Sequence, residues 1–347
     1  MLGGIDNPMR ALIAGLGYIG RKHLANLRRL EPSADIVVWR QKSRDSAVPP
    51  GANSVVFSLQ AAISRGLDIA FLTNPATLHV PTGMELARAG AALFLERPIA
   101  ASMDGVDELL ALCKRRGLPV MVGYPLRFDP ALRILRDAVA AGKIGRMLHV
   151  RAEVGQYLPD SRSGADYRRS AGARAELGGG AILELSSELD YARWIGGEIS
   201  SVTAQASKVS YLEIDTEDHA DILLQFASGA TGCVHMDMFQ RTAVHQCRVA
   251  GTEGTAVWDG INGDARLYSV ADRRWTQLVP AEEFDRNQMY IEEMRAFLKT
   301  AREGSTPPVT GDDGRHVLQI ALAAKRSAQE QHTVEVQAPA NSVEAVR

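Results

Sequence analysis

Between residues 10 and 122, short and almost continuous apolar runs alternate with stretches that have apolar residues at helical spacing. The runs are residues 11–14, 36–39, 68–72, 92–95 and 119–122, and the helical stretches are 21–30, 80–89 and 103–116. Uninterrupted apolar strands are typical of a sheet covered on both faces, and strand–helix alternation indicates parallel βαβ units. The pattern predicts an α/β chain whose N-terminal Rossmann domain, residues 9–125, has a doubly wound parallel sheet.

From residue 126 to residue 336 the pattern is different. A helix is expected over residues 130–141, a strand near 147–156 and an apolar helix over 181–195. Strands joined by short turns are then expected at 202–209, 219–226, 230–238, 246–250, 255–258 and 265–270, before helices at 287–302 and 312–329. This order predicts a C-terminal α+β domain with a mostly antiparallel sheet, on which the last helix packs back.

Three segments lie outside these periodic regions. Residues 157–180 are polar and long for a structureless loop, which makes them a candidate active-site loop. Residues 1–8 and 337–347 are expected to be disordered. In chains of this organisation, ligands usually bind at the carboxyl ends of the parallel strands, on the side of the second domain.

Composition narrows the possible partners. The 347 residues include 39 basic and 41 acidic ones, a net charge of −2, so no basic excess exists to bind a nucleic acid. The three cysteines are far apart, as expected of reduced thiols in a cytoplasmic protein. No signal peptide is visible, and no apolar run approaches the ~20 residues that span a bilayer. A small-molecule partner fits this composition best.

The first apolar run leads directly into the turn Gly15-Leu16-Gly17-Tyr18-Ile19-Gly20 and then into a helix. Gly15 permits a tight turn, Gly17 lets a pyrophosphate approach the backbone, and Gly20 lets the helix pack closely on the strand. The free N–H groups at the helix start then hold the anion. Tyr18 and Ile19 complete this candidate dinucleotide-binding turn. The alternative is a strand–helix turn that binds nothing.

The second strand ends at Trp39, where an NAD-binding domain usually carries a carboxylate for the ribose hydroxyls. Here the chain continues as Arg40-Gln41-Lys42-Ser43-Arg44. Cations and a hydroxyl suit a 2′-phosphate, which makes Arg40, Ser43 and Arg44 candidate ligands and favours NADP(H) over NAD(H). The alternative is a solvated basic loop.

Several later motifs resemble one family. Thr73-Asn74-Pro75 with His79 follows one strand, and Glu96-Arg97-Pro98 follows the next. Gly123-Tyr124-Pro125-Leu126-Arg127-Phe128, Gly178-Gly179-Gly180 and Gly251-Thr252-Glu253-Gly254-Thr255 come after them in order. In order and spacing these motifs resemble the glucose–fructose oxidoreductase/inositol dehydrogenase (Gfo/Idh/MocA) family, over roughly residues 9–336.

The resemblance implies an open sheet in the second domain whose outer face forms a homo-oligomer, a dimer or tetramer. It places Thr73, Asn74, Pro75 and His79 beside the cofactor, and Glu96 and Arg97 beside the nicotinamide. The family commonly transfers hydride between NAD(P) and a sugar or cyclitol carbon. The segments 153–159 and 184–191 look most like members that act in surface-sugar and amino-sugar synthesis.

The chain departs from the family at two residues. Arg97 stands where the family usually has lysine; with a pKa above ~12 it can polarise an oxygen but is a poor acid or base, unless it is merely a tolerated replacement. The family's catalytic histidine falls on Glu188 or Ser187, depending on which neighbouring motif anchors the comparison. Glu184 stands at the family's Asp position.

Glu184 and Glu188 are four residues apart, so on one continuous helix they would share a face. Their mutual repulsion would then raise the pKa of one carboxyl and leave a general acid. The alternative is that both are solvated or paired with Arg193 and its neighbours.

Further candidates come from tyrosines and arginines. Tyr124 and Tyr167 are possible proton donors, and Arg127, Arg168 and Arg174 are possible ligands of an anionic substrate group. For each of them the alternative is an ordinary packed or surface side chain, which is favoured for Tyr167.

No metal site is predicted. His235 and Asp237 alternate along an expected strand and would share a face, but the sequence shows no third ligand.

These observations predict an NADP-preferring oxidoreductase that acts on a sugar, amino-sugar or related polar carbonyl, with reduction favoured. Two alternatives stay open because the family's Lys and His are replaced. One is a non-standard reaction, such as imine reduction or redox-assisted isomerisation. The other is a non-catalytic, nucleotide-binding regulatory protein.

Overall fold

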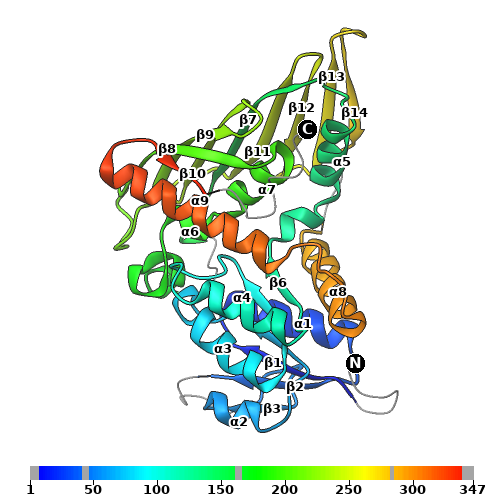
Figure 1. Cartoon of the computed structure of the whole chain (residues 1–347), viewed down its shortest axis with the longest axis vertical. Coiled ribbons are helices and arrows are strands. Elements are labelled where there is room, and N and C mark those ends of the chain that lie inside the picture. The colour runs from blue at the N-terminus through cyan, green and yellow to red at the C-terminus, as the bar shows by residue number, and fades with distance from the viewer. Residues whose placement is uncertain (1–7, 41–46, 161–165, 282–284, 338–347) are drawn as a thin grey trace. The chain divides into compact units, whose positions relative to one another are not determined.

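The computed structural model describes residues 8–40, 47–160, 166–281 and 285–337 (Figure 1). The chain divides into two compact units: unit 1 comprises Met1–Pro125 and Arg286–Arg315, and unit 2 comprises Leu126–Asp285 and His316–Arg347. The segment Arg286–Arg315 differs from the prediction, because it belongs to unit 1. The predicted disorder of residues 1–8 and 337–347 falls almost wholly outside the described residues.

Unit 1 contains the predicted parallel sheet. Within the described residues it has six strands in the order β3-β2-β1-β4-β5-β6. Its strands are β1 (Arg10–Ala14), β2 (Asp35–Trp39), β3 (Ser54–Val56), β4 (Ile69–Leu72), β5 (Ala92–Glu96) and β6 (Val120–Gly123). The strand order reverses direction between β1 and β4, where doubly wound sheets bind dinucleotides. The Rossmann fold is therefore confirmed; among its described strands the three-residue β3 was not predicted.

Helices cover both faces of this sheet. They are α1 (Tyr18–Leu30), α2 (Leu59–Ile63), α3 (His79–Ala89), α4 (Val106–Arg115) and α8 (Asn287–Glu303). Contacts join α1 to α8 and α3 to α4, and the two pairs lie on opposite faces (Figure 1). Right-handed crossovers require this arrangement, because the chain moves in opposite directions from β1 to β2 and from β4 to β5.

An aromatic cluster explains why α8 belongs to unit 1. Phe297 of α8 packs edge-on against Phe71 at 5.3 Å and Phe94 at 5.5 Å between ring centroids. The His23 ring of α1 lies 5.2 Å from Phe94. Aromatic burial of this kind contributes strongly to a core. The sequence could not show that a helix about 200 residues after β5 completes this core.

Unit 2 contains the mixed, mostly antiparallel sheet. Within the described residues the order is β14-β13-β12-β11-β7-β10-β9-β8-β15, and the pair β7–β10 is parallel. The strands are β7 (Met147–Gly155), β8 (Ile199–Ser207), β9 (His219–Phe226), β10 (Thr231–Asp237), β11 (Val244–Gly251), β12 (Gly254–Asp259), β13 (Asp264–Ser269), β14 (Arg274–Val279) and β15 (Val334–Glu335). Neither β14, which lacks an alternating pattern, nor the two-residue β15 was predicted.

The helices of unit 2 lie on one face of its sheet (Figure 1). They are α5 (Pro130–Ala140), α6 (Ala181–Glu184), α7 (Ser187–Gly196) and most of α9 (Gly311–Glu330). Along β9, buried residues alternate with exposed ones such as Leu223, which is 60% exposed. Alternation is the pattern of a sheet with one covered and one open face. The homo-oligomer expected through the open face stays a prediction.

Two further findings bear on the sequence analysis. Among the described residues, no helix is both long and apolar enough to cross a membrane. Cys113, Cys233 and Cys247 are all free thiols, as expected from their wide spacing.

Candidate functional site

The glycine turn of unit 1 leaves room for a phosphate. Gly15 has φ +101°, and a Cβ on Gly20 would lie 2.3 Å from the Gly15 carbonyl oxygen, so both positions require glycine. A Cβ on Gly17 would meet nothing within 4 Å. Gly17 is also the N-cap of α1, and no side chain caps that end. Open space beside uncapped backbone N–H groups fits the pyrophosphate of a dinucleotide.

Thr73 joins this turn to the end of β4. Its Oγ1 lies 3.1 Å from the Ala14 carbonyl oxygen and 2.8 Å from that of Gly15. A Cβ on Gly15 would lie 2.9 Å from the Asn74 backbone nitrogen, so the two loops are in close contact. Two of the motifs that the sequence predicts beside a cofactor are therefore neighbours in the fold.

His79 joins the Asn74 turn to the loop after β5. Its Nε2 lies 2.9 Å from the Asn74 carbonyl oxygen, and its Nδ1 lies 3.1 Å from that of Pro98. Burial lowers the pKa of His79, although these carbonyl contacts act in the opposite direction. A neutral imidazole carries a single N–H, so in that state the ring donates to only one of these two carbonyl oxygens while it packs between both loops.

Glu96 and Arg97 stand at the end of β5. The Glu96 carboxylate lies 2.5 Å from Nε2 of the buried His23, which fixes Glu96 against α1. Arg97 precedes a cis peptide bond to Pro98. Burial raises the pKa of Tyr290 on α8 to about 12, while the positive charge of Arg97 acts in the opposite direction. Tyr290 is thus a neighbour of the candidate nicotinamide region that the sequence analysis missed, because it lies in α8.

The other candidates in unit 1 are less well defined. Arg40 follows β2 and is partly buried, whereas Ser43 and Arg44 lie outside the described residues. Tyr18 is 60% exposed at the start of α1. Tyr124, which follows β6, is fully buried, and its role as a proton donor stays a prediction.

In unit 2, the predicted shared helix face of Glu184 and Glu188 is wrong. Glu184 ends α6 and Glu188 is the second residue of α7, so the helix expected over 181–195 is interrupted. Serine favours helix ends over helix interiors, and Ser186 is the N-cap of α7. The carboxyl groups of Glu184 and Glu188 therefore do not share one face of a continuous helix.

Glu188 instead contacts an imidazole. Its Oε1 lies 2.9 Å from Nε2 of His245 on β11, and the side chains of Glu188 and His245 are 2% and 14% exposed. The His245 ring also packs edge-on against Trp258, with centroids 4.8 Å apart. The contact places an imidazole beside Glu188, one of the two residues to which the resemblance assigns the family histidine. Ser187, the other candidate for that position, is buried beside it in sequence.

His245 was not predicted from the sequence, although one signal for it was present. His245 lies one residue before the expected strand 246–250, and in β11 it alternates with the apolar Cys247, so both side chains face the helix-covered side of the sheet. A polar histidine on a core face requires a partner. The partner, Glu188, is 57 residues away in the chain, and only the fold brings the two together.

Arg127 is not available as the predicted substrate ligand. Its guanidinium makes a bidentate contact with Asp190 of α7, at 2.9 and 2.7 Å, and the two side chains are 8% and 0% exposed. Arg193, the expected partner of these carboxylates, pairs with Glu198 instead. The Arg127–Asp190 pair is a structural feature of the helix-covered face.

The loop candidates make local contacts. The Tyr167 hydroxyl accepts a hydrogen bond from the Glu213 backbone N–H at 3.2 Å. Arg168 pairs with Asp166 at 2.8 Å, and Arg174 lies 3.4 Å from Asp215. Exposed pairs of this kind contribute little to stability and leave the cations accessible to solvent.

Comparison with known proteins agrees with this geometry. Residues 9–124 match an oxidoreductase family with an NAD-binding Rossmann fold, and residues 132–257 match the GFO/IDH/MocA C-terminal domain. Myo-inositol 2-dehydrogenase of Thermotoga maritima is 26% identical, with 95% of this chain and 99% of the relative covered. For scyllo-inositol 2-dehydrogenase (NAD(+)) of Bacillus subtilis the identity is 25%, with 93% and 95% covered.

Among solved structures, levoglucosan dehydrogenase in complex with NADH and levoglucosan has a TM-score of 0.84. It is 21% identical, and the alignment covers 95% of this chain and 100% of that one. At this identity the likeness concerns the fold. Matches to both family domains, in order, show that the chain belongs to the Gfo/Idh/MocA family of oxidoreductases with an NAD-binding Rossmann domain.

Proposed function

We propose that the chain is a nicotinamide-dependent oxidoreductase of a sugar, cyclitol or related polar carbonyl, in which the Glu188–His245 pair transfers the proton. The observation that carries the proposal is the 2.9 Å contact between Glu188 Oε1 and His245 Nε2 on the helix-covered face of unit 2. The names of the inositol dehydrogenase relatives support the substrate class.

His245 can serve in both directions of the reaction. The Glu188 carboxylate accepts the Nε2–H bond, which fixes the tautomer and leaves the lone pair on Nδ1. Among the described residues, none is hydrogen-bonded to Nδ1. Neutral His245 can therefore take the proton from an alcohol, and protonated His245 can give it to a carbonyl oxygen. In the protonated state, Glu188 balances the charge of the ring.

A bound nicotinamide cofactor supplies or accepts the hydride. In unit 1 the residues that would hold it are the Gly15–Gly20 turn, which would bind the pyrophosphate, and the Thr73–Asn74 turn, whose Asn74 carbonyl oxygen His79 contacts. We assign to Arg97 the stabilisation of negative charge on the substrate oxygen, and for this reason reduction is favoured over oxidation. The basic sequence from Arg40 to Arg44 supports NADP(H) as the preferred cofactor.

Two measurements test this function. The first is the dissociation constant of NADPH and of NADH, from fluorescence titration of the full chain; a ratio near one would overturn the NADP preference alone. The second is turnover on a panel of inositols, aldoses and keto-sugars with each cofactor. Bound cofactor with no turnover in either direction across the panel would favour the regulatory alternative.

The acid–base role is tested by His245→Gln and Glu188→Gln. Loss of a general acid–base group typically lowers kcat by ~10²–10⁴-fold, and the pH profile of kcat should lose one limb. His149→Gln is the matched control, because His149 lies on the open face of the same sheet. Unchanged kcat and pH profile in His245→Gln would remove the Glu188–His245 pair from the mechanism.

A further inference from the structure

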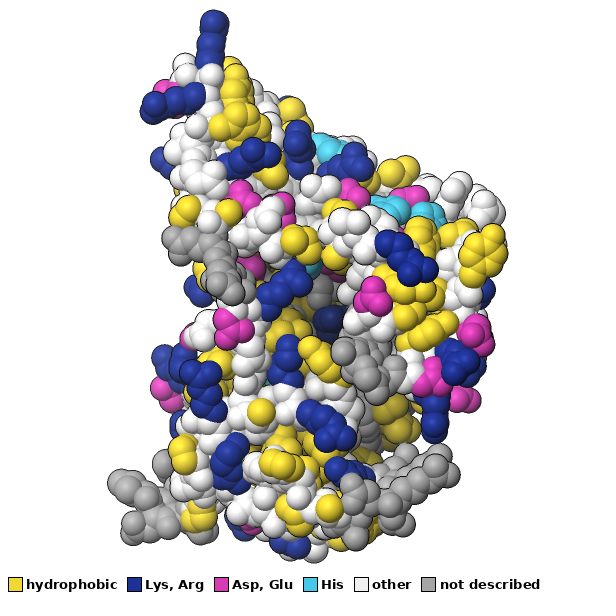
Figure 2. Space-filling model, turned by 180° about the vertical axis from the view of Figure 1, so that it is seen from behind, with side chains coloured by type: hydrophobic (Ala, Val, Ile, Leu, Met, Phe, Trp, Pro, Cys, Tyr) yellow, Lys and Arg dark blue, Asp and Glu magenta, His cyan; other side chains and the backbone are white. Residues whose placement is uncertain are grey.

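Four polar side chains form a compact square on the open face of the unit 2 sheet. The antiparallel register of β9 and β10 sets Asp221 opposite His235 and His219 opposite Asp237. On β9, Ala220 lies between His219 and Asp221, and on β10, Met236 lies between His235 and Asp237. Both are fully buried, so the four polar side chains all point to the other face. Figure 2 shows histidine side chains, in cyan, on this face.

Three of the four residues bring ligand atoms close together. Nδ1 of His235 lies 2.8 Å from Oδ1 of Asp221, and Nε2 of His219 lies 3.1 Å from Oδ2 of Asp221. All three ligand atoms lie within 4.8 Å of one another. In a tetrahedral zinc site, ligands bonded at ~2.0–2.1 Å stand roughly 3.3 Å apart. Small side-chain rotations would therefore bring the three atoms around one ion.

Asp237 fixes the orientation of the His235 ring. Its Oδ2 lies 3.1 Å from His235 Nε2, and its carboxylate is fully buried. Its Oδ1 accepts backbone hydrogen bonds from Phe239 at 3.0 Å and Gln240 at 2.8 Å, so it cannot swing away freely. A carboxylate that holds one histidine nitrogen, and thereby aims the other, is the usual support of a metal-binding histidine.

We propose that His219, Asp221 and His235 bind a divalent transition-metal ion such as Zn²⁺, with Asp237 as the positioning residue. Two imidazoles and one carboxylate suit zinc and its neighbours in the first transition row, and poorly suit Mg²⁺ or Ca²⁺. The site and His245 lie on different faces of the sheet. On β7, Glu153 pairs in register with His235 and the next residue, Val154, pairs with His245, and successive side chains of a strand point to different faces. The proposal is therefore independent of the proposed acid–base pair.

The test is calorimetric titration of ZnCl₂ into the full chain after treatment with a chelator, together with thermal melting. We expect saturable binding of one ion per chain and a melting temperature that rises with zinc concentration. Asp221→Asn keeps the shape of a side chain that is 57% exposed, and His219→Gln removes an imidazole. Each variant should weaken zinc binding at least ~10-fold.

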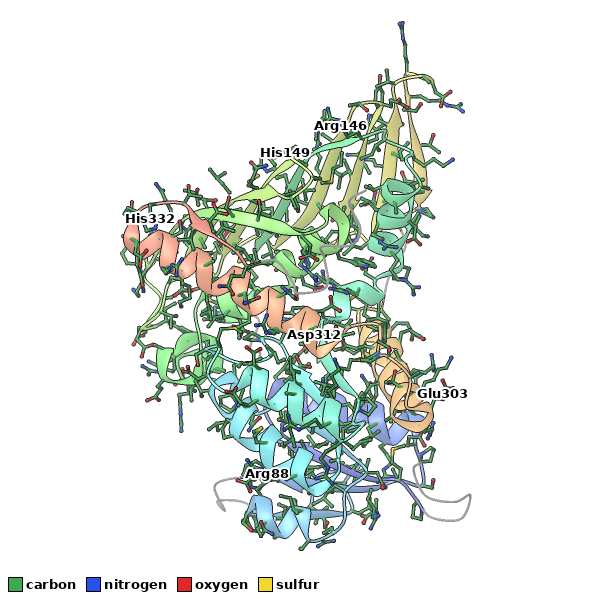
Figure 3. The ribbon with its side chains drawn as sticks, in the orientation of Figure 1. Arg88, Arg146, His149, Glu303, Asp312 and His332 are labelled. Atoms are coloured by element: carbon green, nitrogen blue, oxygen red, sulfur yellow. The ribbon has the colours of Figure 1, made fainter. Side chains whose placement is uncertain are left out.

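The matched control is again His149→Gln. His149, labelled in Figure 3, lies on β7 on the same sheet face, with its Nδ1 2.8 Å from Thr231 Oγ1 and outside the square. This variant should bind zinc like the unaltered chain. Absence of saturable binding, or binding that survives both Asp221→Asn and His219→Gln, would overturn the proposal and leave the square as a hydrogen-bonded ion-pair network. Circular dichroism of each variant shows whether a loss of binding reflects unfolding.

Discussion

In unit 1 the candidate cofactor residues follow the ends of the adjacent parallel strands β2, β1, β4 and β5, whereas in unit 2 the Glu188–His245 pair joins a helix to a strand 57 residues away. In a parallel sheet every strand ends at the same edge, so short motifs after successive strands become neighbours. In the antiparallel sheet of unit 2, side chains meet according to register and to the helix packed above them.

The two units also differ in the contacts that stabilise their candidate sites. The unit 1 loops are held by backbone contacts: Thr73 contacts the carbonyl oxygen of Gly15, and His79 contacts that of Asn74. The helix-covered face of unit 2 relies on buried charges, in the Arg127–Asp190 and Glu188–His245 pairs. Unit 2 should therefore lose more stability when a single side chain is replaced.

The largest effect is expected from Arg127→Met. The change leaves Asp190, which is fully buried, without its bidentate partner. Breaking a buried ion pair by removing one member typically costs ~3–5 kcal/mol of unfolding free energy, because the remaining charge is uncompensated. Urea denaturation of the variant measures this loss.

The double variant Arg127→Met with Asp190→Leu is the matched control. It replaces both charges by apolar side chains of similar size, and such replacement is often neutral. Recovery of most of the lost stability would assign the effect to the orphaned charge. A single variant within ~0.5 kcal/mol of the unaltered chain would show that the buried pair does not stabilise unit 2.

Smaller effects are expected in unit 1, where Gly20→Ala should lower stability and Gly17→Ala should lower cofactor affinity. A Cβ at residue 20 would clash with the Gly15 carbonyl oxygen, and overpacking of this kind costs ~1–3 kcal/mol. A Cβ at residue 17 meets no protein atom within 4 Å, so Gly17→Ala should fold normally but bind NADPH more weakly. Melting temperature and cofactor titration together separate the two outcomes. Unchanged NADPH affinity in Gly17→Ala would contradict the assignment of this turn to the pyrophosphate.

The same contrast explains what the sequence could and could not predict. The Gly15–Gly20 turn was identified because each glycine meets a local requirement within one strand–turn–helix unit. The buried ion pair of Arg127 was not predicted, because its partner Asp190 lies 63 residues further along. The shared helix face predicted for Glu184 and Glu188 is wrong because the helix is interrupted at Leu185 and Ser186.

Partners that depend on strand register were missed for the same reason. His219 and Asp221 come beside His235 only when β9 and β10 pair, and His245 meets Glu188 only when α7 packs over β11. Tyr290 was missed because α8 returns to unit 1 after the whole second sheet. Local patterns therefore predict elements and loop motifs well, and they leave contacts between distant segments undetermined.

The smallest expected effect is a pH dependence of the unfolding free energy. It belongs to unit 1, because it arises from the buried His79. Burial lowers the pKa of His79 below 6.5, while the unfolded chain titrates near ~6.5. The unfolded state then binds more protons between these two values, so stability is complete above pH ~6.5 and falls as the pH drops through the folded value. The slope from one proton cannot exceed ~1.4 kcal/mol per pH unit.

His79→Gln should remove this part of the acid sensitivity, because glutamine does not titrate. Denaturation curves give the unfolding free energy of each chain at pH 7.5 and at pH 5.5. The loss between the two pH values in the unaltered chain, minus the loss in His79→Gln, is the contribution of His79. An equal difference in both chains would show that His79 does not titrate on unfolding, and that the loops of unit 1 are held without a proton-linked contribution.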